Sequence, residues 1–404
     1  MSPSGIKIDI FLEFVKFTCK VAISLLRIFI FREVVFMENY FVKGERKALA
    51  LGNRGPIHFG SDGRLSQHIC EAYSRYGFYV FQSVLKTDEL NELHLDIESM
   101  LERAPVTEGS ELNQFGQKAL GVDCKAPTFF WAAPLSDPFG GTPAAGGRHP
   151  VKMPEPCPQP NTPEKAIFLV LGSLQFSHAC LRTYGHPELL QVAAAINGED
   201  FTPFNEALFI KKPGIGASVA WHQDGLTHWD SDKLDEGTHG FNFMAQLYGS
   251  TARNGVWVVP GTHKLGKINI KNLVEAEGSP YLSVAVPMVC APGDVVMSNR
   301  QLVHGSFANT GDSTRVTVNF GFHRKSSVLG VKAGGVHNAE AIYDAKRIED
   351  RSRVIALAID ARRKRFPKED SFCYKPFVGR KTKDVWNIDS LETLKDYNLL
   401  DLSI

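Results

Sequence analysis

The chain has 404 residues, of which 43% are hydrophobic and 22% are charged, with a formal net charge of +1 and a pI of about 7.7. This composition is ordinary for a globular protein, and the length allows one elaborated domain or two. The balanced charge gives no sign of a nucleic-acid partner, since the one basic run, residues 362–365, is short and is expected to be a solvated helix face.

The seven cysteines are scattered and contain no C-x-x-C pair, so neither a disulfide framework nor a zinc ribbon is indicated. No Asn-x-Ser/Thr glycosylation signal occurs either. Both observations favour a reducing, intracellular setting, and we expect a cytoplasmic protein.

Residues 6–36 are rich in large apolar side chains, but charged residues such as Glu13, Lys20 and Arg27 interrupt them. No run reaches the roughly 18 apolar residues of a membrane-spanning helix, and no signal-peptide cleavage pattern follows. Three interpretations stay open: an interfacial amphipathic helix, a helix packed on the domain, or a dispensable extension upstream of Met37. Packing or dispensability is favoured over membrane contact, and the role of residues 1–50 is left unassigned.

The next elements follow helical and extended patterns. Residues 61–76 predict a helix that leads into a strand at Phe78–Phe81. Thr87 is expected to cap the following helix, which has acidic residues in its first turn. Leu90, Leu93, Ile97 and Leu101 form an apolar stripe at helical spacing and are expected in the core.

Residues 139–163 combine glycines with repeated prolines and cannot form a regular helix or an inner strand. They predict a long loop, which is either a lid or binding loop or a surface insertion. A helix is predicted after it, at Pro187–Ile196.

From residue 206 the pattern becomes β. Short apolar runs separated by glycine and proline turns lie at 207–210, 241–248, 255–259, 282–290 and 294–297. Such spacing favours a sandwich or barrel.

The stretch Arg315–His323 has the clearest alternation. Val316, Val318, Phe320 and Phe322 share one face, and the other face begins at Arg315. One apolar and one polar face suit the wall of a barrel with a polar interior site. From about residue 331 a helical segment is expected, strongest at 339–366, with a tail that packs on the core. The predicted organisation is an extension at 1–50, a β domain at 51–330 and a C-terminal segment at 331–404.

His222 and Asp224 stand two residues apart, so both point to one face of an extended segment. His304 and Arg315 follow later in the chain. Two histidines and one carboxylate can bind one face of an octahedral iron and leave other positions open. The arginine offers a planar fork of donors to a carboxylate. With 13 histidines in the chain, His-x-Asp alone is weak evidence.

The order of several motifs is more specific than any one of them. Trp221-His222-Gln223-Asp224 is followed by the segments 254–264 and 292–296, by His304-Gly305-Ser306 and by Arg315. This order resembles the phytanoyl-CoA dioxygenase-like family of Fe(II)/2-oxoglutarate-dependent oxygenases over residues 61–325. The resemblance implies a mainly β fold with flanking α-helices, built on a double-stranded β-helix (jelly-roll or cupin-like) core.

The resemblance also implies the site. His222, Asp224 and His304 would bind Fe(II), Arg315 and Ser306 would hold the far carboxylate of 2-oxoglutarate, and Gln223 would contact that co-substrate too. With O2, the expected reaction hydroxylates an unactivated C–H bond of a small molecule and releases succinate and CO2. Desaturation and oxidative ring closure stay open, whereas the carboxylate of Asp224 disfavours halogenation.

Two other classes of function are weighed against this one. A non-catalytic jelly-roll that binds a ligand is expected to have lost a metal ligand or the arginine, and all four residues are present. A membrane-associated protein would depend on residues 6–36. We expect no nucleic-acid partner, and no protein partner is predicted.

Overall fold

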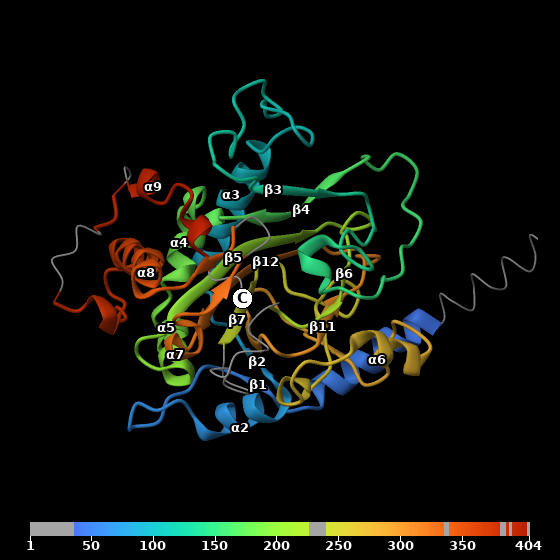
Figure 1. Cartoon of the computed structure of the whole chain (residues 1–404), viewed down its shortest axis with the longest axis horizontal. Helices are drawn as coiled ribbons and strands as arrows, with labels where there is room; N and C mark the ends of the chain where they lie inside the picture. Colours follow the sequence, from blue (N-terminus) through green and yellow to red (C-terminus); the bar gives the residue numbers. More distant parts are fainter. Residues whose placement is uncertain (1–35, 226–239, 335–338, 380–384, 388–389, 402–404) are drawn as a thin grey trace, which may run out of the picture.

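The computed structural model describes residues 36–225, 240–334, 339–379, 385–387 and 390–401. Most of the predicted N-terminal apolar segment, residues 6–35, lies outside this range. Two β-sheets form the centre, and helices surround them (Figure 1). The fold is the predicted jelly-roll with flanking helices.

The larger sheet has eight strands in the order β1-β2-β10-β7-β12-β5-β4-β3, and the smaller one has four in the order β6-β11-β8-β9. The strands of the larger sheet are β1 Arg54–Gly55, β2 Phe78–Phe81, β3 Phe129–Ala132, β4 Ala166–Leu171, β5 Thr202–Lys211, β7 Gly240–Gln246, β10 Val295–Asn299 and β12 Arg315–His323. Those of the smaller sheet are β6 Val219–His222, β8 Trp257–Val258, β9 Val286–Pro287 and β11 His304–Ser306. A short pair, β13 Lys332–Ala333 and β14 Ala341–Ile342, follows.

Strand β12 lies at the centre of the larger sheet, between β5 and β7. Its apolar residues, from Val316 to Phe322, belong to the main hydrophobic core. Its alternate residues Arg315, Thr317 and Asn319 line a pocket on the other face. The predicted division into an apolar core face and a polar site face is therefore confirmed.

Helices pack around both sheets. They are α2 Gln67–Tyr76, α3 Thr87–Glu102, α4 His178–Tyr184, α5 Pro187–Asn197, α6 Ile270–Glu277, α7 Lys325–Val328, α8 Ala345–Arg365 and α9 Ser390–Thr393. Figure 1 shows α4, α5 and α8 together on one side of the molecule. Residues of all three enter the same core cluster as the apolar face of β12, so this layer supports the sheet from behind the site.

Several predicted elements are confirmed. The strand at 78–81, the helix from residue 187 and the strand at 315–323 lie where expected. In the predicted stripe of α3, Leu93 and Ile97 are buried, and Leu90 and Leu101 pack against the core. Strands β3 and β4 and helices α4 and α6 were not predicted.

Two local predictions were wrong, and a third is confirmed only in part. Helix α3 begins at Thr87 itself, and the carboxylate of Glu89 accepts the N–H of Lys86 (3.1 Å), which occupies the cap position. Residues 339–344 are not helical, because α8 begins only after Asp344, whose side chain caps it. The basic run is only partly solvated, since Arg362 is buried and paired with Glu89 at 2.7 Å.

A helix over residues 36–49 packs on the smaller sheet. The ring of Tyr40 stacks on Trp257 of β8, with centroids 4.6 Å apart, and its hydroxyl donates to the carbonyl of Leu282 (2.9 Å). Gly44 allows the close approach, because a Cβ there would lie 2.3 Å from the Trp257 ring. Residues 36–49 therefore pack on the domain, whereas the segment for which three interpretations were left open, residues 6–36, lies outside the described residues except for Phe36. No helix in the described part of the chain is long and apolar enough to cross a membrane.

Candidate active site

The pairing of β6 with β11 brings the two predicted histidines together. These strands are antiparallel, and His222 lies directly opposite His304. The two imidazole centroids are 4.1 Å apart. Gly305 follows His304, and a Cβ at this position would lie only 3.0 Å from the carbonyl oxygen of Val219 on β6. The small residue in the His-Gly-Ser motif therefore permits close strand contact beside the site.

Both histidines are oriented by their own backbone. The Nδ1 of His222 lies 2.8 Å from the carbonyl oxygen of Ala220, and the Nδ1 of His304 lies 2.9 Å from that of Leu302. A carbonyl can only accept, so each Nδ1 carries the proton and each Nε2 keeps a free lone pair. Burial, together with His222 beside it, lowers the pKa of His304 to about 4, so that this ring is neutral at physiological pH.

Asp224 follows β6 and completes the group. Its Oδ1 lies 3.5 Å from the Nε2 of His222 and 3.9 Å from that of His304. Its Oδ2 accepts a hydrogen bond from the side-chain amide of Asn242 on β7 (3.0 Å), and Arg300 lies 3.8 Å away. Burial acts to raise the pKa of Asp224, but these neighbours outweigh it and hold the pKa well below its ordinary value.

This donor set fits a divalent iron. The three ligand atoms lie within 4.8 Å of one another. Among the described residues, no other group of three or more His, Cys, Asp or Glu side chains is arranged to hold a metal ion. Two neutral imidazole nitrogens and one carboxylate oxygen are the donors of the facial arrangement that leaves iron positions open. The backbone carbonyls on the far ring nitrogens are the outer contacts that metal-bound histidines ordinarily have.

Arg315 and Ser306 lie in the same pocket. Arg315 is buried, and its Nε donates to Thr317 Oγ1 (2.9 Å) and its Nη1 to the carbonyl of Asn254 (3.2 Å). Burial lowers the pKa of Arg315 to about 10, which leaves the guanidinium charged at neutral pH. The hydroxyl of Ser306 accepts a hydrogen bond from the ammonium of Lys211 (3.0 Å).

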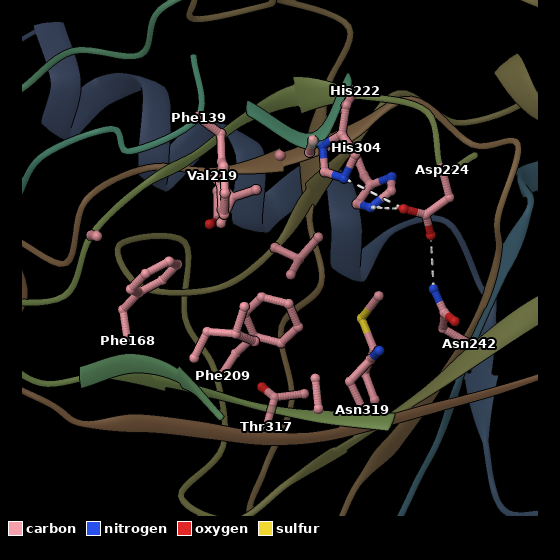
Figure 2. Close-up of a pocket in the computed structure, with 18 of the residues that line it drawn as sticks. Phe139, Phe168, Phe209, Val219, His222, Asp224, Asn242, His304, Thr317 and Asn319 are labelled. Atoms are coloured by element: carbon pink, nitrogen blue, oxygen red, sulfur yellow. Dashed lines mark hydrogen bonds and ion pairs between the residues drawn. The ribbon is translucent and has the colours of Figure 1, made fainter. Parts of the chain in front are cut away.

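A pocket lies between the two sheets and is lined by residues of β5, β6, β7, β11 and β12. Figure 2 shows His222, His304 and Asp224 gathered at one end, with Asn242 next to the carboxylate. Phe139, Phe168 and Phe209 form an aromatic wall away from them. A few polar groups beside an apolar wall are typical of small-molecule sites.

Gln223 has a different environment from the other predicted site residues. Its side-chain amide donates to the carbonyls of Gln301 (2.6 Å) and Gly266 (3.0 Å) and accepts the N–H of Ile268 (2.8 Å). It is not among the residues that line the pocket. The side chain thus holds two loops together, and this geometry gives no support to a co-substrate contact.

Other lining residues were missed by the sequence analysis. Arg148 and His149 come from the loop at 139–163, Lys211 from the end of β5 and Asn242 from β7. The long loop was recognised, but its composition carried no signal for which side chain points inward. Lys211 had one usable signal, since it shares alternation with Ala207 and Phe209 along the strand.

Residues 167–317, less than half of the chain, match the family model described as phytanoyl-CoA dioxygenase (PhyH). No curated protein matches the chain in sequence. Among solved structures, the chain is similar to EvdMO1 (22% identity, 62% of this chain and 48% of that chain, TM-score 0.42). It is also similar to EctD from S. alaskensis with 2-oxoglutarate and 5-hydroxyectoine (19%, 72% and 83%, TM-score 0.46). A third is the non-heme alpha ketoglutarate dependent carbocyclase SnoK from nogalamycin biosynthesis (18%, 66% and 87%, TM-score 0.42).

These structural likenesses are distant, and the chain spans about half of the length of EvdMO1. The family match is stronger evidence, because its residues 167–317 contain His222, Asp224, His304 and Arg315, the four residues that the sequence pattern singled out. Over residues 167–317 the chain is therefore similar to the phytanoyl-CoA dioxygenase family.

Proposed function

We propose that this protein is an Fe(II)/2-oxoglutarate-dependent oxygenase, which hydroxylates an unactivated C–H bond of a small molecule and converts 2-oxoglutarate to succinate and CO2. The observation that carries the proposal is one pocket that holds two histidine Nε2 lone pairs, the carboxylate of Asp224 and a buried arginine. The first three groups suit iron, and the fourth suits a carboxylate.

His222, Asp224 and His304 are the proposed iron ligands. The carbonyls of Ala220 and Leu302 keep each ring in the tautomer that a metal requires. The side-chain amide of Asn242 donates a hydrogen bond to Oδ2 of Asp224, so Oδ1 is the carboxylate oxygen that faces the histidines. When Fe(II), 2-oxoglutarate and O2 are bound, this group supplies the oxidation that replaces a substrate C–H by C–OH.

Arg315 and Ser306 are proposed to bind the far carboxylate of 2-oxoglutarate. Arg315 projects from the polar face of β12. Thr317, on the same face, also lines the pocket. A charged guanidinium with little water around it forms strong, directional hydrogen bonds to a carboxylate. This contact would orient the co-substrate with its 2-oxo end toward the three metal ligands.

The remaining walls are proposed to hold the primary substrate. Phe139 of the long loop and Phe168 of β4 pack together with centroids 5.8 Å apart, and both line the pocket. Such a wall suits an apolar carbon skeleton and excludes water from the reacting bond. Asp224 would supply a carboxylate as the third iron ligand, which would leave no position for a halide in its place, so hydroxylation is favoured over halogenation. Desaturation and ring closure use the same groups and are the alternative outcomes.

The test is a product assay on iron-loaded protein. Succinate formed after admission of O2 is measured, and a library of small molecules is then screened for compounds that accelerate it. The proposal expects an accelerated rate with a product heavier by one oxygen atom. A product lighter by two hydrogens would replace hydroxylation by desaturation or ring closure. Absence of succinate from protein that binds iron and 2-oxoglutarate would favour a non-catalytic ligand-binding protein.

A further inference from the structure

Two buried basic side chains lie next to each other on adjacent strands of the larger sheet. In the antiparallel pairing of β5 with β12, Lys211 lies directly opposite Arg315. Both side chains line the pocket, and both residues are only 3% exposed. Like charges directly opposite each other in a sheet destabilise it, and burial increases the cost.

The ammonium of Lys211 is directed toward the proposed carboxylate subsite. It donates to the hydroxyl of Ser306 (3.0 Å) and to the carbonyl of Phe307. Because Ser306 accepts from Lys211, its own hydroxyl hydrogen is available for another acceptor. Gly216 encloses the base of the side chain, since a Cβ there would lie 2.6 Å from the Cβ of Lys211. The position of Lys211 is therefore fixed by packing as well as by hydrogen bonds.

No carboxylate of the described residues forms an ion pair with Lys211 or Arg315. Asp137 is the acidic residue whose field reaches Lys211, but its oxygens accept backbone N–H groups, from Gly140 at 2.9 Å and Met153 at 2.8 Å. Burial, followed by the charge of Arg315, lowers the pKa of Lys211 well below its ordinary value. Such an arrangement costs stability in the free protein and is typical of a binding site for an anion.

We propose that Lys211 is a co-substrate-binding residue that joins Arg315 and Ser306 around one carboxylate and thereby selects 2-oxo acids with an anionic far end. The inference rests on the proposed function, since the ligand is 2-oxoglutarate. It assigns to β5 a part in co-substrate selection. A 2-oxo acid that ends in a methyl group would leave both cations without a partner and would bind weakly.

The experiment compares two ligands in the iron-loaded full-length protein without oxygen. Binding of 2-oxoglutarate and of 2-oxopentanoate, which has the same chain length but no far carboxylate, is titrated in wild type and in Lys211→Met. One charged hydrogen bond corresponds to about a 10- to 100-fold change in affinity. We expect Lys211→Met to weaken the binding of 2-oxoglutarate by about this factor. The affinity for 2-oxopentanoate should change by less than about threefold, and the affinity for iron should not change.

The matched control is Lys212→Met, which removes the adjacent lysine, an exposed side chain, and is expected to leave both affinities at the wild-type value. Lys211→Arg restores the charge and should recover part of the affinity. Lys211→Gln keeps a hydrogen-bond donor without the charge. If Lys211→Met does not fold, the same comparison is made with Lys211→Gln, for which the same loss is expected.

Unchanged 2-oxoglutarate affinity in the Lys211 variants overturns the proposal. An equal loss for both acids, together with loss of iron, also overturns it, because that result means a structural role for the lysine. Wild-type protein that binds iron but neither acid instead overturns the proposed function, so the two failures are distinguishable.

Discussion

At the scale of single residues, the site depends on how the two histidines are held before any metal arrives. Each ring uses its Nδ1–H on a carbonyl two residues earlier in its own segment, Ala220 for His222 and Leu302 for His304. The rings therefore need no rearrangement to present Nε2. Asp224 is oriented separately by Asn242 from the larger sheet, so the three groups are positioned by both sheets at once.

Replacement of Arg315 by Ala should weaken binding of the co-substrate 2-oxoglutarate more than binding of the primary substrate. The loss of a buried charged partner is worth on the order of 2–5 kcal/mol, or roughly 30- to several-thousand-fold in affinity. The 2-oxoglutarate requirement for succinate formation measures this change. Arg315→Lys, which keeps the charge but loses the planar fork, should lie between wild type and Arg315→Ala. A rise in the requirement for the primary substrate of the same size would contradict the assignment.

The four chemically distinctive residues could be predicted from the sequence, and their surroundings could not. His222 and Asp224 are recognisable because they stand two residues apart on one face of an extended segment, and His304 and Arg315 are recognisable because they follow in a specific order of motifs. Gln223 belongs to the same motif, yet its amide binds backbone groups of Gln301, Gly266 and Ile268. Those partners come from distant loops, and no local pattern specifies them.

At the scale of elements, the loop at 139–163 contributes to the wall of the pocket. Its residues Phe139, Arg148 and His149 line the pocket, which favours the binding-loop interpretation over a surface insertion. The ring of His149 lies between Phe139 and His222, with centroids 5.3 Å and 4.2 Å away. Both of its nitrogens are buried without a hydrogen-bond partner. Polar atoms in this condition are costly unless a ligand satisfies them.

His149→Ala is therefore predicted to impair use of the primary substrate more than binding of 2-oxoglutarate. The ratio of hydroxylated product to succinate should fall, because a poorly held substrate lets co-substrate turnover proceed without it. The readout is that ratio, measured with the substrate found in the screen. Lys152→Ala, a half-exposed residue of the same loop, is the control and should retain wild-type coupling. A His149→Ala variant with full coupling would rule out a substrate contact.

Strand β5 is also tied to the C-terminal segment through a buried carboxylate. Glu206 is fully buried and accepts hydrogen bonds from the backbone N–H of Ser173 (2.8 Å) and from the hydroxyls of Ser173 and Tyr397. Burial raises the pKa of Glu206 to about 7, and these hydrogen bonds oppose that rise only in part. The native state therefore retains a proton that the unfolded chain releases near the ordinary glutamate pKa of 4.5.

The pH dependence of stability follows from this difference. Between about pH 4.5 and pH 7 the folded protein binds more protons at Glu206 than the unfolded chain does, so stability falls as pH rises through this window. A loss of roughly 2 kcal/mol between pH 5 and pH 8 is expected from this group. Denaturant unfolding at both pH values in wild type and Glu206→Gln measures it. The free energy of unfolding should change less with pH in the variant than in wild type. The same pH dependence in both proteins would contradict the raised pKa of Glu206.

At the scale of the whole molecule, the smaller sheet is supported from outside by an aromatic cluster. Tyr40 and Phe41 of the helix over 36–49 contact Trp257 and Phe307, and Phe307 stacks on Tyr281 with centroids 4.8 Å apart. Phe307 follows β11 directly, three residues after His304. The sequence could not predict this arrangement, because Tyr40 and Trp257 are 217 positions apart (257 − 40).

Tyr40→Ala should destabilise the fold by about 2–4 kcal/mol, through lost stacking and a cavity beside Trp257. Leu49→Ala, on the same helix but with an exposed side chain, should change stability by less than about 0.5 kcal/mol. Both free energies of unfolding are measured by urea denaturation.

Removal of residues 1–35 should leave 2-oxoglutarate binding intact. Loss of co-substrate binding on removal of residues 1–35 would instead favour a functional role for that segment.

The most direct test of the central claim is an anaerobic titration of the purified protein with Fe(II) and 2-oxoglutarate, monitored by the weak visible metal-to-ligand absorption band. We predict a saturable band in wild type, one iron per chain, and no band in Asp224→Ala, which lacks a ligand but keeps both histidines. No band in wild type, or an unchanged band in Asp224→Ala, would contradict the assignment of His222, Asp224 and His304 as the iron site.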